Sequence, residues 1–405
     1  MNDAVFQKDQ TDYRALSGRL FSALLSRFGT DYISEIEDAV QNSFLKSLKI
    51  TDQKKKPDNL ENWLFIVARN DVLNQIKAKK EKHDTDAFLP EQGDQSADQQ
   101  KDLRLQTILF IASLDIISAQ SKIIFVLKNI FGLSVSEIHS CTLLKEEAIY
   151  KSAGRTRKII RQQYQCKPID LPLMGQKKQT AIIAEEILYS VFNIGFDSFS
   201  EKTQDIVNMD LCLEAFSLAR LLLNEFKLDS TSNLLAVFSL HTARIPAKIE
   251  NGKLIPFFDQ NRASWNAELF QLGVLYLKKP QTETRFYVES LIALKYMTME
   301  TFAENDWKDI INLYQLLQRI SPSPIVKLNY CYCLSKTGNT AAVLEMLAKV
   351  EKELPGRHVY FNIIKAKIMA EINQEESNSL FASIAAGLSQ KIRKEHLLGN
   401  GLIQL

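Results

Sequence analysis

The spacing of apolar residues constrains the fold of this chain more than any other feature of its sequence. Apolar side chains recur every three or four positions along most of the 405 residues, and no segment sustains an alternation of apolar and polar residues. The first spacing is typical of an α-helix with one buried face, whereas alternation is typical of a strand. In the first such segment Leu20, Leu24 and Phe28 share a face, and Gly29 follows them. We therefore predict an all-α protein.

Segments with little to bury divide the chain into units. Residues 83–101 are rich in Asp, Gln, Gly and Pro, a composition that does not offset the entropy cost of folding. Pro168, Pro172 and Gly175 mark a second boundary. We predict a small helical unit over residues 10–82, an acidic linker over 83–102, a second helical unit over 103–165 and a longer helical domain over 179–405.

The longer C-terminal domain carries a repeat in its pattern. Helix starts are predicted near Asp306, Thr340 and Glu375, at intervals of about 34 residues, which is the period of tetratricopeptide repeats. We therefore predict a tetratricopeptide-like helical array. Such arrays form concave surfaces that bind peptides, so a regulatory protein or peptide is a hypothetical partner for this domain.

Composition excludes several classes of protein. The five cysteines are scattered and odd in number, and no His or Cys spacing is typical of a metal site, so we expect reduced thiols, no metal and no cofactor. Neither a signal segment nor a run of about 18 apolar residues is present. We therefore expect a cytoplasmic protein without membrane association. The formal net charge is only +2, but basic residues are concentrated locally.

One of these basic concentrations follows a helix-turn-helix pattern. Ser134 and Glu137 have the spacing of a capping box, which predicts a short helix from Ser134 to Ser140. A four-residue turn over 141–144 leads to a long helix that starts at Lys145. In a helix-turn-helix the second helix enters the DNA major groove.

The long second helix has a basic face. Lys151, Arg155 and Lys158 recur at spacings of four and three residues, and Tyr150 and Arg157 flank them. A basic stripe can also be an ordinary solvated helix face. The preceding capped helix and tight turn favour DNA binding, although this motif alone suits any repressor or activator.

The second predicted helix, residues 35–48, begins with carboxylates, which also favour a helix N-terminus. Polar Gln41, Asn42 and Ser43 follow them, and we expect Phe44 or Leu45 to be exposed beside these. Acidic side chains next to an apolar strip suit docking on a basic helical surface of a partner.

The third predicted helix, residues 60–80, begins apolar and ends basic. Its expected core residues are Trp63, Leu64, Ile66, Val67, Leu73 and Ile76. Asn70, Asn74 and Lys77 recur along another side, which could follow a nucleic-acid strand through charge and hydrogen bonds.

These segments together resemble the bacterial extracytoplasmic-function (ECF) sigma factors. The stretch E-I-E-D-A-V-Q-N-S-F-L-K-S-L resembles their region 2.2, and P-D-N-L-E-N-W-L-F-I-V-A-R-N-D-V-L-N-Q-I-K resembles regions 2.3–2.4. The stretch L-D-I-I-S-A-Q-S-K-I-I-F-V-L-K-N-I-F-G-L-S-V-S-E-I-H resembles region 4. Later pieces, including L-H-T-A-R-I-P-A-K and D-Q-N-R-A-S-W-N, are similar to the tetratricopeptide-like C-terminal extension of one ECF subgroup. The resemblance covers nearly the whole chain.

The resemblance implies two sigma domains, with core RNA polymerase and promoter DNA as partners. The resemblance assigns polymerase docking to Glu37, Asp38 and Gln41. It assigns contacts with the opened −10 strand to Asn70, Asn74 and Lys77. The loop over residues 51–59 would capture a flipped −10 base, and the acidic linker would run toward the RNA exit path. The −35 element would be bound by Tyr150, Lys151 and Arg155 at the bases and by Arg157 and Lys158 at phosphates.

The chain also departs from the family pattern. Ser152 and Gly154 replace a basic and a bulky residue that many members carry, which puts some −35 contacts in doubt. In the extension, positions where acidic residues are expected are occupied by Ile194, Thr242, Asn261 and Asn266.

The sequence suggests three candidate functions for the whole chain. The first is a sigma factor that directs core polymerase to promoters and has no catalytic residue of its own. The second is a stand-alone helix-turn-helix regulator whose C-terminal domain senses a ligand or protein. The third, an enzyme using His241 with Arg244 or Asp259 with Arg262, is rejected because no nucleophile, phosphate loop or metal-ligand set accompanies them. Arginines in a helical array more often cap helix ends or pair with acids.

Overall fold

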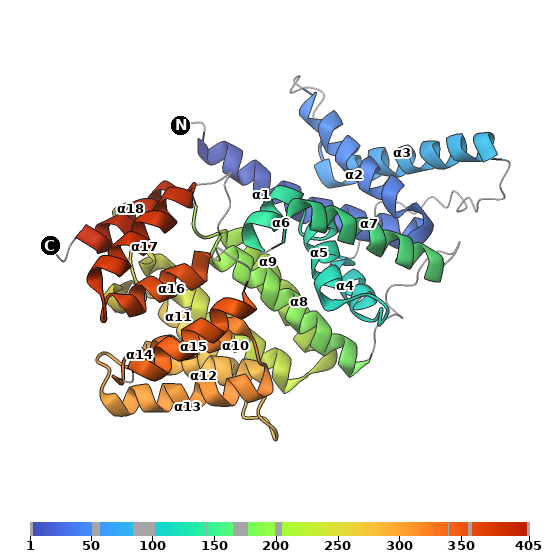
Figure 1. Ribbon diagram of the computed structural model, residues 1–405. Coiled ribbons are helices and arrows are strands. Elements are labelled where there is room, and N and C mark those ends of the chain that lie inside the picture. Colours follow the sequence, from blue (N-terminus) through green and yellow to red (C-terminus); the bar gives the residue numbers. More distant parts are fainter. Residues whose placement is uncertain are drawn as a thin grey trace. The chain divides into compact units, whose positions relative to one another are not determined.

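The structure is a computed structural model that describes residues 3–50, 57–83, 102–142, 144–164, 177–198, 205–338, 340–354 and 359–402. Most of the predicted base-capturing loop, the acidic linker and residue 143 of the predicted turn lie outside these residues. The described chain is helical apart from one antiparallel hairpin of two-residue strands, β1 (Ile249–Glu250) and β2 (Lys253–Leu254) (Figure 1). The all-α prediction is therefore confirmed. None of the described helices is both long and apolar enough to cross a membrane.

The chain forms two compact units, residues 1–191 and 192–405. The first unit begins with α1 (Asp3–Phe28), the short 3-10 helix η1 (Thr30–Tyr32), α2 (Ile33–Leu48) and α3 (Leu60–His83). α2 and α3 pack against each other (Figure 1), and α1 contacts both. Their shared core includes Leu20, Leu24, Ile36, Leu64 and Ile76, all of which are buried.

The apolar face of α3 is rotated from the predicted one. Ala68 and Val72 are fully buried, whereas Ile66 is 49% exposed. Leu64, Ala68 and Val72 are four residues apart, so this series lies on the face that packs on α2. The prediction that Ile66 is buried was wrong. In the sequence pattern the large apolar side chain of Ile66 is a stronger hydrophobic signal than the small side chain of Ala68, which is the residue that is buried.

The first unit continues with α4 (Arg104–Ala112), α5 (Ala119–Asn129), α6 (Val135–Cys141) and α7 (Glu146–Gln163). Phe110, Phe125, Ile138 and Ile149 are fully buried in these helices. α1 packs against α4 and α5, so the helices of residues 3–83 and 102–164 belong to one packed body. Gly18 permits this approach, because a Cβ added there would lie 2.0 Å from the Ile130 carbonyl oxygen.

α8 (Lys178–Phe196) crosses the boundary between the units, and α9 (Met209–Phe226) and α10 (Asp229–Ala243) follow. α10 is buried along most of its length and packs against α9, α11 (Ala267–Tyr276) and α12 (Arg285–Thr298) (Figure 1). The connection from α10 to α11 contains the hairpin and the short 3-10 helices η4 (Ile245–Ala247), η5 (Phe257–Asp259) and η6 (Arg262–Ser264).

The rest of the second unit is a series of helices, most of which pack against their neighbours in sequence. It comprises α13 (Glu304–Ile320), α14 (Pro324–Ser335), α15 (Thr340–Glu353), α16 (Val359–Met369), α17 (Gln374–Gly387) and α18 (Lys391–Leu402) (Figure 1). Separate apolar clusters lie between successive helices. The observed starts of α13, α15 and α17 lie within two residues of the predicted ones, as expected for stacked repeats.

Candidate nucleic-acid interface

The local geometry of the helix-turn-helix follows from its capping residues. The Ser134 hydroxyl accepts a hydrogen bond from the Glu137 amide at 3.2 Å, and the Glu137 carboxylate accepts one from the Ser134 amide at 2.8 Å. The predicted capping box is therefore confirmed, and α6 starts where the sequence indicates. α7 packs against α6 and α5 through buried Ile149, Ala153 and Ile160.

The outer face of α7 carries most of the residues predicted to bind the −35 element. Tyr150 is 62% exposed, and Lys151, Arg155 and Lys158 are exposed as well. The Lys151 ammonium pairs with Glu147 one turn earlier at 2.5 Å, an exposed pair that contributes little stability. The face therefore combines one aromatic ring with cations that solvent, or a polyanion, can reach.

Arg157 lies on a different side of α7 from these exposed residues. Its guanidinium contacts the Glu37 carboxylate of α2 at 3.3 Å, and Lys128 of α5 donates to the same oxygen at 2.6 Å. Glu37 is only 8% exposed as a result. Glu37, predicted to dock on polymerase, and Arg157, predicted to bind phosphate, are thus paired with each other in this conformation.

Further contacts join the same two groups of helices. Arg14 of α1 forms an ion pair with the capping-box residue Glu137 at 2.6 Å. The Thr30 hydroxyl donates to the backbone carbonyl of Tyr164 at 2.9 Å. These contacts bridge residues more than 120 positions apart in sequence, so no local spacing could have indicated them.

The remaining predicted docking residues on α2 are accessible. Asp38 and Gln41 are exposed, and Leu45 beside them is exposed too. Of Phe44 and Leu45, one of which was expected to be exposed, Phe44 is buried and packs against Tyr13 with ring centroids 4.1 Å apart. Ser43, expected on the exposed polar side, is buried as well. The apolar strip next to the acidic residues therefore comes from Leu45 and not from Phe44.

The predicted strand-contacting side of α3 is exposed along its length. Asn70, Asn74 and Lys77 all face solvent at spacings of four and three residues. This side of α3 can therefore offer amide hydrogen bonds and one positive charge to a strand.

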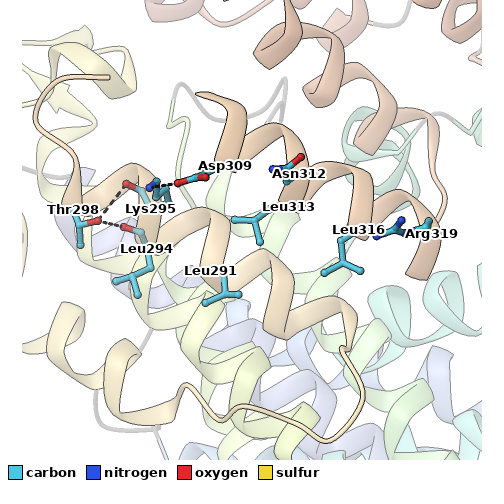
Figure 2. A pocket seen from close by; sticks show the side chains of 9 residues that line it. All are labelled: Leu291, Leu294, Lys295, Thr298, Asp309, Asn312, Leu313, Leu316 and Arg319. Carbon is cyan, nitrogen blue, oxygen red and sulfur yellow. Dashed lines mark hydrogen bonds and ion pairs between the residues drawn. The ribbon is translucent and has the colours of Figure 1, made fainter. Parts of the chain in front are cut away.

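The second unit contains a shallow groove of about 560 Å³ between α12 and α13. Figure 2 shows that Leu291 and Leu294 of α12 line it opposite Leu313 and Leu316 of α13. Lys295 at one end is hydrogen-bonded to Asp309 at 2.8 Å, which raises the pKa of that ammonium. The groove is mainly apolar, and its polar lining residues are Lys295, Thr298, Asp309, Asn312 and Arg319.

The side chains that the structure describes include neither a reactive cysteine nor a metal-binding cluster. Cys212, Cys331 and Cys333 are buried free thiols, as predicted, and burial raises their pKa values to about 12, 12 and 11. No group of three His, Cys, Asp or Glu side chains within the described chain is arranged to hold a metal ion.

The family and the protein found to be similar to this chain have no described activity. Residues 183–281 match a family described as one of unknown function, DUF6596. An uncharacterized protein of Rhizobium meliloti (strain 1021) is 26% identical over 355 residues, which cover 84% of this chain and 82% of that protein. No solved structure matches the chain. The family match lies outside the candidate interface and covers most of α8 and all of α9, α10, the α10–α11 connection and α11.

Proposed function

We propose that this protein is a sigma factor that binds core RNA polymerase and directs promoter recognition and DNA melting. One observation carries the proposal: only four residues separate the capped α6 from an α7 whose exposed face combines Tyr150 with Lys151, Arg155 and Lys158. Base edges in the major groove are read by such side chains near the start of a recognition helix, and phosphates are bound by cations further along.

The exposed side of α3 supports a second contact with DNA. Asn70, Asn74 and Lys77 offer donors and a positive charge along about two helical turns. A side of this kind suits a separated strand, whose backbone and unstacked bases accept hydrogen bonds. A stand-alone repressor has no use for a strand-binding module beside its helix-turn-helix, so this side of α3 favours a promoter-melting factor.

Two charges needed for the proposed function are sequestered in this conformation. Glu37 would contact polymerase and Arg157 would contact a phosphate, but they pair with each other and with Lys128. The proposed activity therefore requires α2 to separate from α5 and α7 on the polymerase. The exposed Asp38 and Gln41 offer the first docking contacts before Glu37 is released.

A pull-down with core RNA polymerase tests the proposal. The full-length chain is expected to retain core polymerase, and Asp38→Lys is expected to weaken retention because it reverses an exposed docking charge. Glu268→Lys, an equal charge reversal at an exposed site of the second unit, is the matched control and should retain polymerase normally. Absence of binding by the unmodified chain would refute the sigma proposal and leave the helix-turn-helix regulator.

The C-terminal helical domain is proposed to regulate the factor through a protein or peptide partner. Stacked helical repeats form extended surfaces that bind proteins or peptides. Truncation after about residue 175, followed by promoter-specific transcription, tests this role. Unchanged activity and unchanged regulation would refute it.

A further inference from the structure

The connection between α10 and α11 contains an unusual concentration of unsatisfied polar groups. Within the described chain, ten buried side-chain nitrogen or oxygen atoms have no hydrogen-bond partner. Four of them lie between residues 241 and 265: His241 Nδ1, Arg244 Nε, Gln260 Oε1 and Trp265 Nε1. Folded proteins satisfy nearly all such atoms, so a local concentration of exceptions calls for an explanation.

Arg244 departs from the ordinary behaviour of an arginine in a helical array. Arg262, a few residues further along, caps the end of α12 by donating to the carbonyls of Tyr296, Met297 and Met299. The Arg244 side chain has neither a hydrogen bond nor a carboxylate partner among the described residues, and its guanidinium lies 4.1 Å from the Phe257 ring centroid. The expectation that arginines here cap or pair therefore holds for Arg262 and not for Arg244.

Aromatic rings hold the unsatisfied donors in one region. Trp265 stacks on Phe257, the ring that also carries Arg244, at a centroid distance of 5.9 Å. On the other side of Arg244 in the sequence, His241 contacts the Phe196 ring at 5.1 Å, and the Lys248 ammonium lies 4.1 Å from the same ring. Ring stacking supplies no acceptor for an N–H in the plane of the guanidinium or indole.

Several cations gather around these rings. Lys248 and Arg393 both pair with Asp197, at 3.3 and 2.7 Å, whereas no carboxylate pairs with Arg244 among the described residues. Burial lowers the pKa of Arg244 to about 10, and burial together with Arg244 and Lys248 lowers the pKa of His241 to about 3. The Arg244 side chain is partly exposed, but its buried Nε–H has no acceptor, so an anion that accepts from it and supplies a counter-charge would stabilise this arrangement.

The unsatisfied groups also determine which ligand fits. Arg Nε–H and Trp Nε1–H are donors only, and a neutral histidine can donate from either ring nitrogen. The fourth group, Gln260 Oε1, is an acceptor that an anion would not satisfy. A ligand that satisfies the three nitrogens must be rich in acceptors, and a planar guanidinium binds carboxylate and phosphate oxygens through short, charge-assisted hydrogen bonds. An uncharged amide or hydroxyl would leave the charge of Arg244 uncompensated.

We propose that the α10–α11 connection binds an oxyanion, the carboxylate or phosphate group of a small ligand, through Arg244 and Trp265, with Lys248 adding positive charge. The site lies within the segment that matches the family of unknown function. It gives the second unit a small-molecule ligand that is independent of DNA and polymerase binding.

The indole signals of the full-length chain provide a local readout. The chain has three tryptophans, so protein with ¹⁵N-labelled tryptophan gives three indole N–H signals, and Trp265→Phe identifies the one from Trp265. The chain is titrated with inorganic phosphate, and separately with acetate, while sodium chloride keeps the ionic strength constant. We expect the Trp265 signal to shift saturably and the signal of Trp63, which lies in the first unit, to stay in place.

Variants assign the shift to the proposed donors. Arg244→Gln should weaken binding tenfold or more, about the effect of one charge-assisted hydrogen bond, whereas exposed Arg220→Gln should bind normally. Arg244→Lys keeps the charge and is used if the first variant fails to fold; it should also weaken binding. A response to phosphate alone or to acetate alone identifies the group. No shift with either anion, or an unchanged shift in both Arg244 variants, would overturn the proposal.

Discussion

Replacing Glu37 by Gln should destabilise the first unit while leaving the shape of the side chain intact. The Glu37 carboxylate accepts from Lys128 at 2.6 Å and lies 3.3 Å from Arg157, and its own side chain is 8% exposed. Among the described residues, Glu37 supplies the negative charge of this contact. Glu37→Gln removes that charge and leaves two cations facing a neutral amide. The loss is therefore electrostatic and not a loss of packing.

The size of this effect follows from how far the cations are buried. Removing one partner of a fully buried ion pair costs about 3–5 kcal/mol. The side chains of Lys128 and Arg157 are 21% and 34% exposed, so water can solvate the released cations in part. We therefore expect a loss of about 2 kcal/mol in the free energy of unfolding, which lies between the values for buried and exposed pairs.

Urea denaturation followed by circular dichroism measures this loss. With a urea dependence of about 3 kcal/mol per molar, a loss of about 2 kcal/mol lowers the midpoint of the first unit's transition by about 0.7 M. Asp38→Asn is the matched control, because it makes the same chemical change at the adjacent exposed carboxylate; it should cost less than about 0.5 kcal/mol. A double-mutant cycle of Glu37→Gln with Lys128→Met should give a non-additive coupling energy.

Two results would refute this reasoning. If Glu37→Gln and Asp38→Asn have equal effects, the contact with Lys128 and Arg157 does not stabilise the protein in solution. If the double-mutant cycle is additive, the loss arises from something other than this ion pair.

Three other predictions test the local structure. Gly18→Ala should destabilise by several kcal/mol on thermal unfolding, because its Cβ would meet the Ile130 carbonyl, whereas Gly154→Ala in open space on α7 should stabilise by about 0.5–1 kcal/mol; equal effects would contradict the close packing of α1. Ser134→Ala should cost about 1 kcal/mol through loss of the cap, and no loss would contradict the capping box. Because the pKa of His241 falls from 6.5 to about 3 on folding, its stability contribution is full above pH 6.5 and falls as the pH drops toward 3. Between pH 7.5 and 5 the unmodified chain should lose up to about 2 kcal/mol more than His241→Gln, and equal losses in urea titrations would show that His241 is not buried neutral.

Local signals in the sequence predicted the helices well. The starts of α3 and α6, and the change to a long helix after residue 145, follow from the apolar spacing and from the Ser134–Glu137 capping box. The exposure of Asn70, Asn74 and Lys77 was predicted for the same reason, because it depends only on the position of each residue around one helix.

Contacts between distant segments could not be predicted in this way. The pairing of Glu37 with Lys128 and Arg157 joins residues 91 and 120 positions apart, and their charges alone would suit many other partners. The environment of Arg244 also depends on a contact between separated segments, because the α10–α11 connection brings Phe257 against the Arg244 guanidinium. No sequence pattern identifies an arginine that stacks on an aromatic ring without pairing with an acidic residue.

Transcription from purified components tests the central claim most directly. Core RNA polymerase, genomic DNA fragments from the organism of origin and the full-length chain are combined, and the 5′ ends of the transcripts are sequenced. The sigma proposal predicts discrete start sites that require the chain, share sequence elements near −10 and −35, and weaken with Arg155→Gln but not with Arg220→Gln. Start sites that are the same with and without the chain would contradict it.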